Sequence, residues 1–224
     1  MISDFNWNEQ NDVPAVLSVL METINSESMS GRRMSEIPVR RVKTCTVCSF
    51  KSPVESTEKM LWVPVRPSVS AMLEGFGADQ ILEGDNAYNC PQCGRKQKAV
   101  ERAELVSAPL FLVLVLRRIV PSLLQPGTLV RDPQKIKYLS PVSVHVKPSE
   151  GVELAVRYET LAVIHHEGTS VKGHYYAHIN RQGRWFRCND RAVTPSVTNS
   201  IGNDTAYVVF CKKVEHNSRL GWAV

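Results

Sequence analysis

The hydrophobic positions of this chain predict one helix near the start and mostly strands after it. Between residues 10 and 25, apolar side chains recur every three or four positions, as on one face of a helix. They are Val13, Val16, Leu17, Leu20, Met21 and Ile24. Asn11 and Asp12 precede them as candidate caps, and Pro14 lies near the first helical position, where its missing N–H costs little.

The rest of the pattern predicts a β-rich protein. The continuous apolar run from Leu110 to Leu116 is typical of a strand buried on both faces. A short helix is expected over residues 68–76, ending at Gly77, and a turn over residues 180–183. Further strands are expected over residues 39–42, 62–65, 153–164, 175–179, 185–188 and 206–211. Together these elements predict an α+β fold with a mixed or antiparallel sheet.

Four of the six cysteines form two Cys-x-x-Cys pairs, Cys45 with Cys48 and Cys90 with Cys93. This spacing lets both sulfurs of a pair face one ion, and two such knuckles complete a tetrahedral zinc site. With four thiolates no position is left for water, so we expect a structural zinc. A zinc ribbon that binds nucleic acid is the alternative, although the roughly 40 residues between the knuckles exceed the usual ribbon loop.

Composition and charge exclude several classes of protein. The longest apolar run is far shorter than the roughly 18 residues that span a bilayer, and the polar N-terminus is not a signal peptide. We therefore expect a cytoplasmic or nuclear protein with no membrane partner. The net charge of +5 is modest and the arginine pairs are dispersed along the chain, so nucleic acid is not an expected partner.

A histidine and an amide form a second constellation of chemical interest. His174 follows Gly173, and Asn189 and Asp190 lie one predicted hairpin away. On adjacent strands, Asn189 can accept a hydrogen bond from Nδ1 of His174 and leave Nε2 facing a thiol. Such a pair would match the base and orienter of a cysteine protease, and a purely structural histidine is the alternative.

The remaining two cysteines do not supply the thiol. Cys188 and Cys211 fall inside apolar strands and are expected to be core residues. Neither lies at a helix N-terminus, where the helix dipole would lower the pKa of a thiol. His165 and His166 lie near His174, but their spacing fits no usual set of metal ligands.

These motifs resemble the ubiquitin-specific protease family of deubiquitinating enzymes. The similarity covers roughly residues 5–213, and the motifs occur in the family's order. They are the Gln-Gln-Asp box (10–20), the cysteine knuckles, the "LP-x-x-L" strand (109–118), the His-x-Gly loop (166–168), the histidine box (173–177), the box of the third catalytic residue (185–195) and the closing strand (206–210). The chain departs from the family pattern at Asn11, Pro14 and Ile119.

The resemblance implies a partial papain-like ubiquitin-specific protease domain over residues 1–213. Its parts would be the start of a palm helix (5–25), a zinc-bearing fingers subdomain (37–108) and a palm sheet with the histidine box (109–213), followed by a loose tail (214–224). A structural zinc ion with four cysteine ligands is implied in the fingers.

The resemblance also implies thiol-dependent hydrolysis at the C-terminus of ubiquitin. His174 would be the general base and Asn189 its orienter, with Asp190 assisting. Ubiquitin itself, or a ubiquitinated protein, would contact Asp12, His166, Gly173 and Tyr175.

The family's cysteine box should lie well before Gln10, so we expect the thumb and the nucleophile to be missing from a chain that begins at Met1. Alone, the chain is then expected to be an inactive, truncated or pseudo-deubiquitinase that binds ubiquitin. A separate thumb-containing chain is a candidate partner. The alternatives are a non-catalytic scaffold module and a zinc-ribbon binder of nucleic acid.

Overall fold

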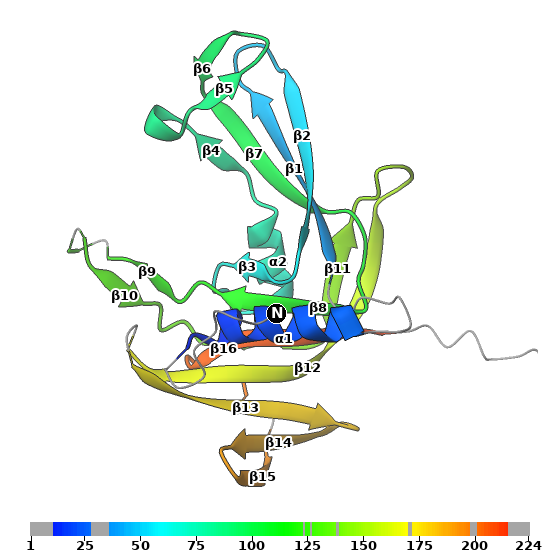
Figure 1. Cartoon of the computed structure of the whole chain (residues 1–224), viewed down its shortest axis with the longest axis vertical. Helices are drawn as coiled ribbons and strands as arrows, with labels where there is room; N and C mark the ends of the chain where they lie inside the picture. Colours follow the sequence, from blue (N-terminus) through cyan, green and yellow to red (C-terminus); the bar gives the residue numbers. More distant parts are fainter. Residues whose placement is uncertain are drawn as a thin grey trace, which may run out of the picture.

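The computed structural model describes residues 11–27, 36–122, 124–125, 127–137, 139–169, 172–197 and 201–214. A large sheet with one helix across it forms the lower half of Figure 1, and a narrow extension of strands projects above it. The mixed α+β fold with few helices, expected from the sequence, is confirmed. The expected segment 5–10, most of the loop after the first helix and the tail after residue 214 lie outside the described residues.

The first helix, α1 (Val13–Glu27), begins where the sequence predicts. The carbonyl of Asp12 accepts hydrogen bonds from the backbone N–H groups of Ala15 and Val16, which starts the first turn. Val13, Leu17 and Met21 pack against the sheet. Two other residues of the predicted stripe, Leu20 and Ile24, are exposed, so the face that α1 buries is narrower than its apolar pattern.

The large sheet, called the palm sheet here, has the order β15-β14-β13-β12-β16-β8-β3, with β11 also paired to β12. All pairs are antiparallel except β3 with β8. The strands are β3 (Leu61–Val63), β8 (Phe111–Leu116), β11 (Val142–Val146), β12 (Leu154–Gly168), β13 (Gly173–Arg181), β14 (Arg184–Asn189), β15 (Ala192–Ser196) and β16 (Ala206–Lys213).

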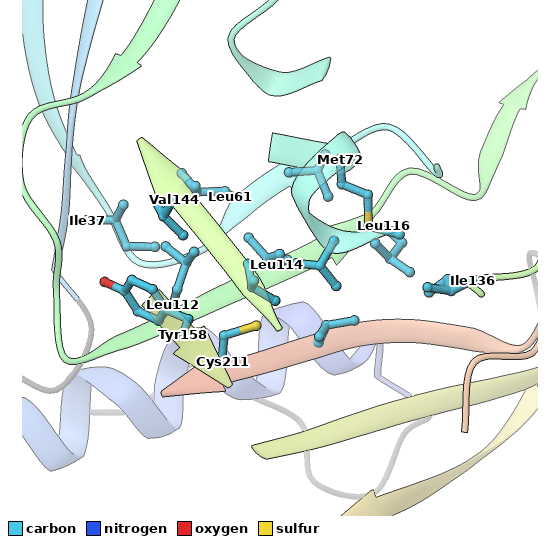
Figure 2. Close-up of a cluster of buried hydrophobic side chains, with 14 of the residues drawn as sticks. Ile37, Leu61, Met72, Leu112, Leu114, Leu116, Ile136, Val144, Tyr158 and Cys211 are labelled. Atoms are coloured by element: carbon cyan, nitrogen blue, oxygen red, sulfur yellow. The ribbon is translucent and has the colours of Figure 1, made fainter. Parts of the chain in front are cut away.

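Strand β8 is buried on both faces, as its sequence predicts. Leu112, Leu114 and Leu116 point into the main core with Met72 of α2 (Val69–Phe76) (Figure 2). The alternate residues of β8, its two valines, pack on the other face in the cluster that α1 covers. Helix α2 is capped by Ser68 and ends at Gly77, which also matches the prediction.

The projecting strands, called the fingers here, carry few apolar side chains. They form a four-stranded sheet, β2-β1-β7-β4, with a two-stranded tip, β5-β6. Their bounds are β1 (Ile37–Cys45), β2 (Lys51–Glu58), β4 (Gln80–Leu82), β5 (Tyr88–Cys90), β6 (Arg95–Gln97) and β7 (Ala99–Leu105), with a short 3-10 helix, η1 (Gly84–Asn86). Cross-strand ion pairs such as Arg41–Glu58 (2.8 Å) support this polar sheet. Only residues 39–42 of it were predicted as a strand, because its strands lack an apolar face.

A further hairpin, β9 (Ile119–Pro121) with β10 (Leu129–Arg131), leaves the end of β8. The backbone N–H of Asp132 donates to the carbonyl of Arg118, which ties the far end of the hairpin back to its start. This places Ile119 and Arg131 beside the start of β13, where the candidate site lies.

Candidate active site

The candidate site begins with the hairpin of β13 and β14. The two-residue turn Gln182–Gly183 has positive φ at both positions (53° and 81°), which suits the twist of a tight hairpin. The hairpin brings Nε2 of His174 to 2.6 Å from Oδ1 of Asn189. Since the amide oxygen only accepts, Nε2 carries the proton and Nδ1 is the basic nitrogen. The side chain of His174 is exposed.

The structure reverses the two nitrogens expected from the sequence, where Nδ1 was assigned to Asn189. Nε2 is the ring nitrogen farther from the histidine backbone, and it is therefore the one that reaches the neighbouring strand. In the described part of the chain, the side chain of His174 makes no other hydrogen bond. Its Nδ1 is left open to take a proton from a nucleophile.

A cleft of about 570 Å³ opens beside His174. Every predicted catalytic or ubiquitin-contact residue lines it except Asn189, which is hydrogen-bonded to His174. The lining includes Asp12, His166, Gly173, His174, Tyr175 and Asp190. Asp190 is exposed and lies in the turn after β14 with φ of 51°, and it makes no described hydrogen bond to His174.

Asp12 is held at the wall of this cleft by two tyrosines. The hydroxyls of Tyr175 and Tyr207 each donate to one of its carboxylate oxygens, both at 3.0 Å. Burial, followed by the charge of Asp12, raises the pKa of Tyr175 to about 12, so this hydroxyl keeps its proton at neutral pH. The carboxylate is exposed but fixed, as a recognition group for a cation needs to be.

Gly173 is required by a close approach. A Cβ atom at this position would lie 1.9 Å from Nε2 of His166. The imidazole of His166 stacks on the ring of Tyr175 with 4.6 Å between centroids. Its backbone carbonyl accepts a hydrogen bond from Arg131 at 2.7 Å. The predicted contact residues His166, Gly173 and Tyr175 therefore form one packed wall.

Two arginines of the cleft were missed by sequence reasoning. Arg118 is 1% exposed and donates to the carbonyls of Asp132 and Gln134, both at 2.9 Å, and of Asn203 and Ala206. Burial lowers the pKa of Arg118 to about 10, so it stays charged at neutral pH. The sequence signal for Arg118 was its position just after the buried strand β8. That position was interpreted only as part of a family motif, not as a residue of the cleft. Arg131, the other one, carried no distinguishing signal.

The four paired cysteines meet at the tip of the fingers. Their sulfurs lie within 4.8 Å of one another, and sulfurs bound to one zinc at about 2.3 Å lie about 3.8 Å apart. The two knuckles are equivalent. The N–H groups of Ser49 and Gly94 donate to the carbonyls of Cys45 and Cys90, and both residues have positive φ. This cluster could hold a metal ion.

Thiol acidity in this cluster fits a cation site. Hydrogen bonding from the backbone of Cys48 lowers the pKa of Cys45 to about 7. The side chain of Cys48, followed by desolvation, raises the pKa of Cys93 to about 12. Four crowded sulfurs do not all ionise without a positive charge among them, and a divalent ion supplies that charge.

The other two cysteines do not face His174. Cys211 is fully buried in the main core, and desolvation raises the pKa of its thiol to about 12. Cys188 is partly exposed rather than a core residue, in contrast to the prediction. Since neighbouring residues of a strand point to opposite faces, Cys188 faces away from Asn189 and His174.

A buried polar network lies beneath the hairpin of β13 and β14. Nδ1 of His178 lies 2.8 Å from Nε2 of His165, and Nδ1 of His165 lies 3.1 Å from both Asn203 Oδ1 and Thr205 Oγ1. His165 is 0% exposed and His178 is 2% exposed. All these contacts are satisfied when both rings are neutral. Desolvation lowers the pKa of His165 to about 3 and also lowers that of His178.

The buried pair makes stability fall in acid. The unfolded chain binds protons at histidines below about pH 6.5, whereas native His165 does not until the pH approaches about 3, so the free energy of unfolding decreases between these values. We expect His165→Gln to flatten this decrease by up to about 1.4 kcal/mol per pH unit. Urea unfolding at pH 7, 6 and 5 measures it, and equal slopes in the two proteins would contradict it.

Comparison with known proteins gives the family. The model of the family described as "Ubiquitin carboxyl-terminal hydrolase" matches residues 1–210. The chain therefore belongs to the ubiquitin carboxyl-terminal hydrolase family, and the resemblance to ubiquitin-specific proteases is confirmed.

Individual relatives cover this chain well, but the chain covers only part of them. Mouse ubiquitin carboxyl-terminal hydrolase 17-like protein C is 30% identical over 94% of this chain and 41% of its own length. Human ubiquitin carboxyl-terminal hydrolase 2 is 28% identical over 84% of this chain and 32% of its own length. The chain thus spans less than half of these curated relatives.

Solved structures share the fold. In the SAGA Ubp8/Sgf11/Sus1/Sgf73 DUB module bound to ubiquitin aldehyde, one chain matches with a TM-score of 0.76 and 20% identity, over 92% of this chain and 50% of that one. The same module with a Cys-to-Ala change, bound to monoubiquitin, matches with a TM-score of 0.74 and 22% identity. Among the described residues of this chain, no helix is long and apolar enough to cross a membrane.

Proposed function

We propose that this chain forms the palm and fingers of a ubiquitin-specific protease and contributes the base half of its catalytic site. The observation that carries this proposal is the 2.6 Å contact of His174 Nε2 with Asn189, which leaves Nδ1 open beside the cleft. His174 acts as the general base and Asn189 fixes its tautomer. Asp190, at the same cleft, is a secondary orienter.

The proposed domain division separates most of the two sheets, although β3, inside the first segment, pairs with β8 of the palm sheet. Residues 37–108 form the fingers, whose tip holds a structural zinc through Cys45, Cys48, Cys90 and Cys93. Residues 109–213 form the palm with the histidine box. The four reduced thiols fit a chain that works in the cytoplasm or nucleus.

The nucleophile comes from outside these 224 residues. This follows from the positions of the six cysteines, of which four form the metal cluster, one is buried and one faces away from His174. A thumb segment, whether on the same polypeptide or on another, supplies the thiol. Alone, the chain binds ubiquitin without hydrolysing it.

The wall of the cleft that carries Asp12 suits a basic residue of a peptide. Asp12 offers a fixed negative charge, and Gly173 lets the imidazole of His166 pack close against the backbone at the wall of the cleft. These features support recognition of the C-terminal tail of ubiquitin. A cation that meets a fixed carboxylate makes a charge-assisted hydrogen bond, about twice as strong as a neutral one.

Ubiquitin binding tests the proposal. We expect the full chain to bind ubiquitin, and Asp12→Asn to weaken the affinity about tenfold, because the charge is lost while the tyrosine contacts can persist. Glu27→Gln, at the other end of α1, is the matched control and should leave the affinity unchanged. Calorimetry at two salt concentrations measures both. No binding to ubiquitin, or equal binding by wild type and Asp12→Asn, would refute the proposed recognition.

A scaffold role without chemistry is the second candidate. It is favoured by the absence of a thiol at His174, and it predicts that a supplied thumb leaves the site inert. Nothing in the described structure favours nucleic acid as a ligand.

A further inference from the structure

The backbone pairing of the catalytic hairpin stops short of Asn189. The register of β13 with β14 runs from Arg181↔Arg184 to Ala177↔Cys188, and Asn189 lies one residue beyond it. On its other side, Asn189 pairs with Ala192 of β15, the outermost strand of the palm sheet. The backbone ladder therefore does not by itself fix Asn189 against His174, and side chains at the end of the ladder have to do so.

One side-chain contact lies at that end. The guanidinium carbon of Arg187 sits 4.3 Å from the centre of the Tyr176 ring, within the range of a cation–π interaction. Arg187 and Asn189 are two residues apart on β14, so their side chains point to the same face of the sheet. Within the described residues the guanidinium of Arg187 makes no ion pair or hydrogen bond, so the ring is its partner.

The ring that Arg187 contacts is itself firmly held. His165 of β12 stacks on Tyr176 with 4.6 Å between centroids and 3° between planes. Because β13 lies between β12 and β14, the Tyr176 ring is contacted from both neighbouring strands, by His165 on β12 and by Arg187 on β14. Its hydroxyl lies 3.1 Å from Thr205 Oγ1, within the buried network that also holds His165. Tyr176 is only 6% exposed, so it offers a fixed contact for the strands at the edge of the sheet.

We infer that Arg187, through its contact with the held ring of Tyr176, is a positioning residue that keeps Asn189 on Nε2 of His174. This inference rests on the proposed function, since it concerns the same base and orienter. Arg187 pins β14 two residues before Asn189, where the backbone ladder ends. Without this contact, Asn189 and the turn that follows it are free to move away from the imidazole of His174.

The tautomer of His174 reports this positioning directly and needs neither thiol nor ubiquitin. In the full chain labelled with ¹⁵N at histidine, two-bond ¹H–¹⁵N spectra at pH 8 give the ratio of the two neutral tautomers. We expect the Nε2–H form of wild type to be favoured about tenfold more than in Asn189→Ala, which removes the acceptor. Arg187→Ala should lower the wild-type ratio about threefold. Arg184→Ala, an exposed arginine on the same strand, is the control and should leave the ratio unchanged.

A second pair of variants separates the ring from its hydroxyl. Tyr176→Phe keeps the surface that Arg187 contacts and should keep the wild-type ratio, whereas Tyr176→Leu should lower it as Arg187→Ala does. Thermal unfolding of each variant is recorded alongside. A lower melting temperature for Arg187→Ala with an unchanged tautomer ratio would show a merely structural role and overturn the inference.

The outcomes distinguish the two proposals. If Asn189→Ala leaves the ratio of His174 unchanged, the base-and-orienter pair itself is wrong. If Asn189→Ala changes the ratio and Arg187→Ala does not, only the positioning role of Arg187 fails. His145, which contacts Glu153 at 3.0 Å, is the internal reference in every spectrum.

Discussion

Removing the proposed zinc ion from the cysteine cluster should unfold the fingers and leave the palm intact. The apolar residues that anchor the fingers to the main core, such as Ile37, Val39 and Leu105, lie at the base of β1 and β7. At the tip, the fully buried side chains are Cys45, Cys90 and Ala99. The tip therefore has little hydrophobic stabilisation of its own. Binding of zinc to four thiolates contributes about 10 kcal/mol or more to folding in small domains.

The measurement has two parts. Elemental analysis of the purified chain should give one zinc per molecule. After chelation, hydrogen exchange should rise steeply in β1, β2 and β4 to β7, while β8 stays protected because it is buried on both faces. Cys48→Ser should reproduce the effect of chelation, and Cys188→Ser, outside the cluster, should not. A chain that holds no metal and has four freely titratable thiols at its tip would contradict the prediction.

The two parts of the fold were predictable to different degrees, because hydrophobic patterning reports burial. Strand β8 was predicted with its burial on both faces, since every one of its residues is apolar. In the fingers, most residues of β2 (Lys51–Glu58) are polar and none is fully buried, so the sequence shows no hydrophobic alternation that would predict a strand. That strand exists because β1 offers a backbone edge and cross-strand ion pairs.

The candidate site was also predictable only in part from the sequence. His174 and Asn189 were placed on one hairpin from the turn at residues 180–183, because a tight turn fixes the register of its strands. Which nitrogen of His174 meets Asn189 depends on side-chain rotamers that no sequence pattern encodes, and the expectation was wrong. Tyr207 completes the clamp on Asp12 from a position 195 residues away, a contact that only the folded sheet reveals.

Supplying a thiol-bearing thumb should turn the base half of this site into an active deubiquitinase. His174 and Asn189 meet on one hairpin, so their geometry does not depend on the thumb. What the thumb adds is a cysteine at a helix N-terminus, whose thiol then loses its proton to Nδ1 of His174. We expect the chain alone to show no cleavage of a ubiquitin C-terminal amide and no reaction with an electrophilic ubiquitin probe. A family thumb, fused before Met1 or added in trans, should give measurable turnover.

Substitutions in this chain then assign the roles. His174→Ala should abolish the restored activity, with a loss of about 10³-fold or more, because the thiol loses its base. Asn189→Ala should cost less, because Asp190 at the same cleft can partly orient the imidazole. Cys188→Ala should leave the restored activity unchanged, since the side chain of Cys188 faces away from His174. A covalent adduct with the ubiquitin probe that disappears in this variant would show that Cys188 is the nucleophile. A folded assembly that binds ubiquitin but gives no turnover would instead mean that the departures at Asn11, Pro14 or Ile119 have dismantled the site, and the scaffold role would replace the proposed chemistry.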